Sequence, residues 1–244
     1  MSTWQISYIQ MPARHKRTLL LLAGLTVLAA ALSLAAGPVV LSPGELWAAL
    51  IGRSCGTAGT ILLHIRLPRT CACLLAGAAL AASGAIIQSV LANPLAAPNI
   101  IGVNAGAGLM VALACALAPT ALALTPVLAF LGAMAGVLLV LAIARRTGAS
   151  RLAAALAGAA VSFAGLLGFV GLIVPHMARR LVGEDSRPLL AASALGGAAL
   201  LTFCDLLSRL LFAPYELPVG VVLSLGGGPF FLWLLLKQRG GRTP

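Results

Sequence analysis

The feature that most constrains this chain is the length of its uncharged apolar stretches. No charged residue occurs from Thr70 to Ala144, and further apolar runs lie on both sides of this interval. A helix of about 20 apolar residues is long enough to cross a bilayer. With 9% charged residues and a mean hydropathy of +1.06, the chain has too few polar side chains to cover a water-exposed surface. Because backbone groups in lipid must pair internally, the sequence predicts an all-α integral membrane protein, a polytopic helix bundle.

Proline and asparagine divide the apolar sequence into expected spans. Two clusters, Asn93 to Asn99 and Pro119 to Pro126, interrupt the uncharged interval, because such clusters end helices. Glycine and alanine are dense within the spans, and small residues allow transmembrane helices to pack backbone to backbone. The expected spans are residues 18–36, 70–91, 101–118, 125–143, 188–203 and 219–236, the last interrupted at 226–229.

The remaining segments are expected to lie outside the membrane. Residues 1–17 end in a basic cluster before the first apolar run, which fits either a signal peptide or an uncleaved first helix, and we expect the uncleaved helix. Residues 37–64 form an extramembrane connection, in which Leu46 to Ile51 is a short interfacial segment with Trp47 at headgroup depth.

The topology depends on residues 152–175, which are long enough for one span or for two short arms broken at glycine. If they cross twice, twelve of the 16 Lys and Arg residues lie inside, whereas one crossing puts seven inside. The positive-inside rule favours two crossings, hence about eight in all with both termini cytoplasmic. The chain is then one membrane-permease domain, 1–244, divided into 1–17, 18–144, a connector at 145–151, 152–236 and a tail at 237–244.

Several functional classes are disfavoured by residue usage. The net charge of +11 comes from small basic groups between apolar runs and not from one basic face, so we expect no nucleic-acid partner. The five cysteines contain no C-x-x-C pair, and we expect neither a disulfide nor a metal site. The spans lack paired carboxylates, metal-ligand clusters and activated nucleophiles, so we expect no catalytic residue and no cofactor, and an ion-driven carrier or intramembrane enzyme is disfavoured.

Asp205 and Arg209 close the span at 188–203. Their spacing of four residues permits an ion pair on one helix face. An alternative is that Asp205 is an intramembrane proton site. Its position at the end of the apolar run favours the pair.

Several strings together resemble the permeases of bacterial ABC importers for ferric siderophores, haem and cobalamin, the FecCD or BtuC-like family. These strings occur in family order at residues 66–69 (RLPR), 77–88 (GAALAASGAIIQ), 93–108 (NPLAAPNIIGVNAGAG), 168–180 (GFVGLIVPHMARR) and 216–231 (ELPVGVVLSLGGGPFF). The resemblance implies a multi-pass protein of the bacterial inner membrane that imports a chelate as a homodimer. Its implied partners are a separate ATP-binding subunit, a periplasmic substrate-binding protein and membrane lipid. The ATPase is expected to be separate because the chain contains no G-x-x-x-x-G-K-[ST] phosphate loop.

The resemblance also implies a docking site for the binding protein. In this family outward arginines receive surface glutamates, and the matching residues are Arg66, Arg69 and Arg209. Guanidinium groups suit carboxylates because they form two parallel hydrogen bonds. The alternative is that Arg66 and Arg69 anchor a helix at the headgroups while Arg209 pairs with Asp205.

Polar residues within the spans suggest two further sites. Ser83, Gln88, Asn93 and Asn104 either line a translocation pathway or form hydrogen bonds between helices. The group His176, Arg179 and Arg180 is expected at the cytoplasmic face, with a ligand or proton-carrying role for His176 as the alternative.

One part of the family pattern is missing. Similar permeases have about ten helices, and two of them, with a long coupling loop, lie where this chain has only RRTGASR at 145–151. The resemblance therefore leaves two functions open, a permease subunit or an internally deleted remnant that inserts but does not couple to an ATPase.

Overall fold

The computed structural model describes residues 12–39, 41–51, 56–90, 103–117, 124–147, 168–211 and 215–239. Every regular element within these ranges is a helix, which confirms the all-α prediction. The long helices are α1 (Ala13–Ala35), α4 (Leu67–Val90), α5 (Val103–Leu117), α6 (Thr125–Thr147), α8 (Gly168–Val182), α9 (Ser186–Leu210) and α10 (Val219–Arg239). The short ones are α2 (Pro43–Leu50), α3 (Thr57–Thr60) and the π-helix η1 (Ile61–Arg66).

Three helices in the described part of the chain are long and apolar enough to cross a membrane, namely α1, the continuous helix Thr57–Val90 and α9. Shorter apolar helices lie at Gly106–Leu117, Thr125–Leu139 and Val219–Phe230. The expected spans thus coincide with helices. The number of crossings and the side on which each terminus lies remain predictions.

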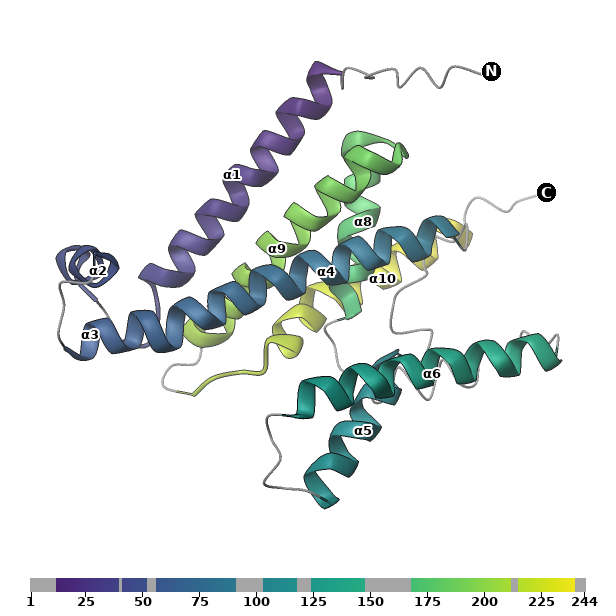
Figure 1. Cartoon of the computed structure of the whole chain (residues 1–244). Coiled ribbons are helices and arrows are strands. Elements are labelled where there is room, and N and C mark those ends of the chain that lie inside the picture. The colour runs from purple at the N-terminus through teal and green to yellow at the C-terminus, as the bar shows by residue number, and fades with distance from the viewer. Residues whose placement is uncertain are drawn as a thin grey trace, which may run out of the picture.

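Helices α4 and α9 form the centre of a bundle. Helix α9 packs against α1, α4, α8 and α10, and α4 also packs against α8 (Figure 1). The apolar window of α9 is 61% buried, whereas that of α1 is 11% buried. A helix that is apolar all round and largely uncovered suits contact with lipid, so α1 belongs to the periphery of the bundle.

Glycines set the helix crossings, as the dense small residues predict. A Cβ built on Gly77 would collide with the carbonyl oxygen of Gly197, so α4 and α9 touch through their backbones at this point. Equivalent contacts join α4 to α8 and α5 to α6, through Gly84 with Gly171 and Gly106 with Gly132 respectively. Helices α5 and α6 pack on each other and lie apart from the main bundle in Figure 1.

The connection expected at 37–64 is partly wrong, because the helix containing α4 begins at Thr57 and not near Thr70. The turn before Pro68 is wound as the π-helix η1, in which the N–H of Leu67 donates to the carbonyl of Leu62. An α-turn would press the proline ring against the carbonyl four residues earlier, and a π-turn relieves this conflict. The short helix α2 does form in the connection, and the Ser42 and Glu45 side chains close its capping box.

The interruption expected at 226–229 is absent, because helix α10 runs through the glycines and Pro229. Helix α8 also continues past a proline, Pro175, to Val182. A proline removes only one backbone hydrogen bond, and in a membrane bundle neighbouring groups can satisfy the carbonyl that is left. Helix α8 begins at Gly168, one of the glycines expected to break the segment 152–175. The first part of that segment lies outside the described residues.

Candidate functional site

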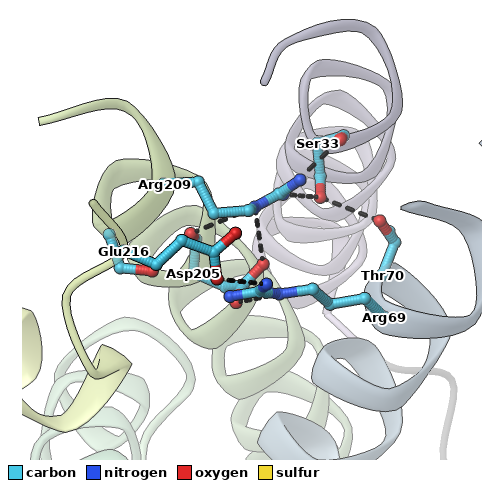
Figure 2. Close-up of polar contacts among 7 residues, drawn as sticks. Ser33, Arg69, Thr70, Asp205, Arg209 and Glu216 are labelled. Carbon is cyan, nitrogen blue, oxygen red and sulfur yellow. Dashed lines mark hydrogen bonds and ion pairs between the residues drawn. The ribbon is translucent and has the colours of Figure 1, made fainter. Parts of the chain in front are cut away.

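A cluster of charged and hydroxyl side chains joins four parts of the chain at one end of the bundle. Arg69 and Thr70 come from α4, Ser33 from α1 and Asp205 and Arg209 from α9, while Glu216 lies in the segment before α10 (Figure 2). We call this set the arginine–carboxylate cluster. It gathers residues that are far apart in the sequence, so it exists only in the folded chain.

Asp205 lies at the centre of this cluster. Nε of Arg69 donates to Oδ1 of Asp205 at 2.9 Å, and Nε of Arg209 is 3.1 Å from Oδ2 (Figure 2). The side chains of Asp205 and Arg209 are each 4% exposed, so both charges are removed from solvent. Nε of Arg209 donates to the backbone carbonyl of Asp205 at 3.4 Å, and its contact with the carboxylate is therefore mainly electrostatic. The ion pair predicted from the spacing of four residues is confirmed.

Hydroxyl groups connect the buried end of Arg209 to two other helices. Nη2 of Arg209 donates to Oγ of Ser33 at 2.7 Å, and this hydroxyl is 2.8 Å from Oγ1 of Thr70. Ser33 and Thr70 are both buried. A buried charge is costly unless its donors find partners. Here Arg209 donates to Ser33 of α1 and to the carbonyl of Asp205 in α9, while Thr70 of α4 hydrogen-bonds to Ser33.

Arg69 forms the rim of the cluster. Its Nη1 donates to Oε2 of Glu216 at 2.7 Å, and the side chains of this pair are 33% and 47% exposed. Arg69 therefore binds a buried carboxylate through one edge of its guanidinium and an exposed carboxylate through the other. Among the arginines expected to dock a partner, it is the one that the structure leaves accessible.

Arg66 is buried at 3% exposure and caps helix α1. Its Nη1 donates to the carbonyls of Leu34 and Ala35 at 2.9 and 2.8 Å, and Nη2 donates to the carbonyl of Val39. The last carbonyls of a helix have no partners within the helix, and a cation is favourable there. A Cβ at Gly37 would lie 2.8 Å from Nη2, so glycine leaves the space that this guanidinium occupies.

The predicted pathway residues have different positions. Gln88 is 2% exposed, and its Nε2 lies 3.4 Å and 3.3 Å from the carbonyl oxygens of Gly171 and Leu172, so in this structure it bonds to another helix. Ser83 donates to the carbonyl of Leu80 in its own helix at 3.0 Å. Asn93 lies outside the described residues. Asn104 lies in α5, and its side chain is not among those described.

The group expected at the cytoplasmic face lies on α8. His176 stacks edge to face on Phe230 of α10, with ring centroids 5.9 Å apart. Arg179 donates to Oε1 of Gln88 and to Oγ of Ser89, the latter at 3.2 Å. Arg180 follows in the same last turn of the helix. Arg179 thus connects α8 to the end of α4.

Within the described residues no group of three metal-ligating side chains occurs, and Cys71, Cys73, Cys115 and Cys204 are free thiols. Cys55 lies outside the described residues. Sequence reasoning missed Ser33, Thr70 and Glu216 as members of the arginine–carboxylate cluster. The available signal was that each lies close to the end of an apolar run, as Asp205 and Arg209 do.

Comparison with known proteins places the chain in a family. The model of the FecCD transport family matches residues 25–158 and 146–237. The vitamin B12 import permease BtuC of Escherichia coli O9:H4 is 32% identical over 326 aligned positions, covering 94% of this chain and 98% of BtuC. The iron(3+)-hydroxamate import permease FhuB of Bacillus subtilis is 33% identical, covering 91% of this chain and 84% of FhuB.

Two further matches differ in extent. The hemin transport permease HmuU of Yersinia pestis is 55% identical over 92 residues, which are 38% of this chain and 28% of HmuU. An inward-facing structure of a metal-chelate type ABC transporter has the same fold, with a TM-score of 0.60 and 22% identity over 91% of this chain and 99% of that one. With a family model that matches most of the sequence and a multi-helix membrane bundle, the chain belongs to the FecCD transport family.

Proposed function

We propose that this chain is a transmembrane permease subunit of an ABC importer in the bacterial inner membrane. The observation that carries the proposal is the FecCD family match, which extends over both halves of a chain built from apolar helices. ATP hydrolysis is then the task of a separate subunit, and the membrane assembly contains two copies of the permease.

The proposed substrate class is a metal chelate of the siderophore, haem or cobalamin type. The support is that relatives of this chain are named for hemin, vitamin B12 and iron(3+)-hydroxamate. Uptake of radiolabelled ferric hydroxamate, hemin and cyanocobalamin by cells that contain the chain with its neighbouring transport genes tests this class. Uptake of none of the three, with the chain present in the membrane, would contradict it.

We further propose that Arg69 is the docking residue for a periplasmic binding protein. Arg66 and Arg209 are committed to buried contacts in this structure, whereas Arg69 is partly exposed and pairs with the exposed Glu216. A carboxylate on the binding protein would take the place of Glu216 on Nη1, while Asp205 continues to hold Nε. An exchange of one carboxylate for another keeps the guanidinium charge paired throughout docking.

The exchange predicts opposite effects of two substitutions on binding-protein affinity. Arg69→Glu should weaken capture by a few kcal/mol if the interfacial pair is desolvated, because it places two like charges together. Glu216→Gln should strengthen capture, since the competing carboxylate is removed. Binding of the cognate binding protein to the permease in nanodiscs at low salt measures both. Unchanged affinity in both variants would contradict docking at Arg69, and weaker capture by Glu216→Gln would contradict the exchange.

A second candidate function is a remnant that inserts but does not couple to the ATPase. Its support is a discontinuity in the middle of the chain: the family match is split into two segments that overlap at residues 146–158. The alignment with BtuC also spans 326 positions, which exceeds the 244 residues of this chain. The lost section would include the cytoplasmic loop that the resemblance assigns to ATPase docking.

Reconstitution with a family ATPase and binding protein distinguishes the two functions. The permease predicts substrate-stimulated ATP hydrolysis well above the rate of the ATPase alone. The remnant predicts no stimulation, although the chain is present in the membrane. A relative in which the middle section is intact serves as the positive control.

A further inference from the structure

Pro175 leaves one backbone carbonyl of helix α8 without its usual donor. In an α-helix the N–H of each residue donates to the carbonyl four residues earlier, which here is Gly171. Proline has no N–H, and its ring also pushes that carbonyl away from the helix axis. Helix α8 nevertheless continues from Gly168 to Val182. The carbonyl of Gly171 therefore needs a donor from outside α8.

The side-chain amide of Gln88 lies at this position. Its Nε2 lies 3.4 Å from the carbonyl oxygen of Gly171 and 3.3 Å from that of Leu172. Gln88 is buried, so water does not compete freely for these carbonyls. The amide of Gln88 on α4 thus stands where the missing N–H of Pro175 would have acted.

The backbone of α4 is shaped to admit this carbonyl. Gly84 precedes Gln88 by four residues and therefore lies on the same face of α4. A Cβ built on Gly84 would collide with the carbonyl oxygen of Gly171. Gly84 provides the space for the displaced carbonyl, and Gln88 provides its hydrogen bond.

Arg179 determines which way the amide of Gln88 points. Nη1 of Arg179 donates to Oε1 of Gln88, and Nη2 lies 3.2 Å from Oγ of Ser89 and 3.5 Å from the carbonyl of Ala85. Arginine only donates and a backbone carbonyl only accepts, so the two neighbours require the same amide orientation. Arg179 lies four residues after Pro175, one turn further along α8.

We propose that Gln88 is a positioning residue that replaces the amide proton missing at Pro175, and that with Arg179 it latches a proline hinge in α8 to α4. The residues of α8 after Pro175 are held to α4 by side-chain hydrogen bonds, in place of one backbone bond of their own helix. When the hydrogen bonds of Gln88 and Arg179 break, the end of α8 can bend at Pro175 without the loss of a backbone hydrogen bond. The latch itself does not depend on the proposed function, and only a role of this bending in transport would rest on it.

A double-mutant cycle tests the replacement directly. Gln88→Met keeps the length of the side chain but removes the donor, together with the Oε1 acceptor of Arg179, whose loss is common to both backgrounds. Pro175→Ala restores the backbone N–H that makes the donor unnecessary. In the wild-type background Gln88→Met should raise the unfolding equilibrium constant by roughly three- to tenfold, the range for one buried hydrogen bond between membrane helices. In the Pro175→Ala background the same substitution should have a markedly smaller effect. Unfolding by SDS in mixed micelles, followed by circular dichroism, measures all four proteins.

The control for this cycle is Ser83→Ala, because Ser83 bonds only within α4 among the contacts described. Its effect should be small and the same in both backgrounds. If Gln88→Met lowers the stability equally in the wild-type and Pro175→Ala backgrounds, the amide does not replace the N–H missing at Pro175, and the proposal fails. Should Gln88→Met not fold, Gln88→Glu removes the amide donor at nearly constant shape and enters the same cycle.

Spin labels test the hinge. Labels at Val90 on α4 and Met177 on α8, both exposed positions, report the distance across the latch in a background without native cysteines. Gln88→Met should broaden the distance distribution, and adding Pro175→Ala should narrow it again. An unchanged distribution in Gln88→Met would show that α8 is not hinged at Pro175. This readout needs no substrate, so it fails or succeeds independently of the transport activity.

Discussion

Asp205 shows how a charge becomes tolerable inside an apolar bundle. Its carboxylate faces two guanidinium groups, and Arg209 in turn reaches the hydroxyl of Ser33. A buried ion pair gives little net stability, because desolvating both charges offsets their attraction. Removing one partner is different, since it leaves the other charge buried and uncompensated. Asp205 and Arg209 therefore each compensate a charge that would be costly to bury alone.

Asp205→Ala is expected to destabilise the fold by about 3–5 kcal/mol, the usual cost of an orphaned buried charge. Glu216→Gln is the matched control, because it breaks the exposed Arg69–Glu216 pair and should cost about 1 kcal/mol or less. SDS unfolding of the purified chain in detergent measures both. Equal losses in the two variants would show that the burial of Asp205 does not control its contribution.

Glu45 provides a pH dependence outside the membrane-spanning helices. The backbone N–H and the hydroxyl of Ser42 donate to its carboxylate at 2.7 and 2.8 Å, and these bonds hold the pKa of Glu45 below its usual range. Because the folded pKa is lowered, the stabilisation of α2 is present above the ordinary pKa of glutamate. It is lost as the pH falls through the lowered pKa.

The expected result is that α2 loosens in acid and that Glu45→Gln removes this transition. Fluorescence of Trp47 on the same helix is a local reporter once Trp4 and Trp233 are replaced by Phe. In the protein that keeps Glu45 and has Trp47 as its single tryptophan, the emission should shift as the pH falls below the usual glutamate range. In the same protein with Glu45→Gln, the emission should stay constant. An acid transition that persists in Glu45→Gln would mean that another group causes it.

At the scale of the elements, the helices are held together by close approach of their backbones. Lipid is as apolar as leucine, so burying apolar side chains between membrane helices gains little, and van der Waals packing has to supply the attraction. Gly77 of α4 and Gly197 of α9 allow that packing, because neither has a Cβ to keep the two backbones apart. The same device joins α4 to α8 and α5 to α6, so each crossing depends on a few small residues.

Gly77→Ala should separate α4 from α9 and destabilise the bundle by about 1–3 kcal/mol, the range for overpacking a close contact. Gly24→Ala in α1 is the control, because a Cβ at Gly24 meets nothing within 4 Å. That substitution should be neutral or slightly stabilising, since alanine favours the helix over glycine. SDS unfolding distinguishes the two. If Gly77→Ala lowers the stability no more than Gly24→Ala does, the close contact of α4 and α9 at Gly77 is contradicted.

At the scale of the whole molecule, the main bundle is organised around α9, while α5 and α6 form a separate pair (Figure 1). Helix α6 ends at Thr147, just where the family match is split and the connector RRTGASR lies. The loss of an even number of spans at this place would preserve the orientation of everything that follows. The count of basic residues leads to the same expectation by a separate argument.

The topology prediction is that the connector near Gly148 and the turn at Glu184 both face the cytoplasm. Gly148→Cys and Glu184→Cys, made singly in a background without native cysteines, should react with a membrane-impermeant maleimide only after the inner side is opened. The physical reason is the preference of arginine for that side of the membrane. Labelling of the two positions from opposite sides would show that residues 152–175 cross once.

The sequence by itself determined the all-α membrane class, the family and most helix positions, because hydropathy, breakers and local spacing act over neighbouring residues. It also predicted the Asp205–Arg209 pair, since both residues lie on one helix. Only the tertiary structure decided which arginines are accessible. Arg66 and Arg209 are both buried and donate to groups near the end of α1, whereas Arg69 stays at the rim. The tertiary structure likewise decided that Pro175 does not end α8, because the donor that completes the helix comes from Gln88, distant in the sequence and adjacent only after α4 and α8 have packed. Hydrogen bonds and desolvation depend on neighbours in space, and local sequence patterns do not contain them.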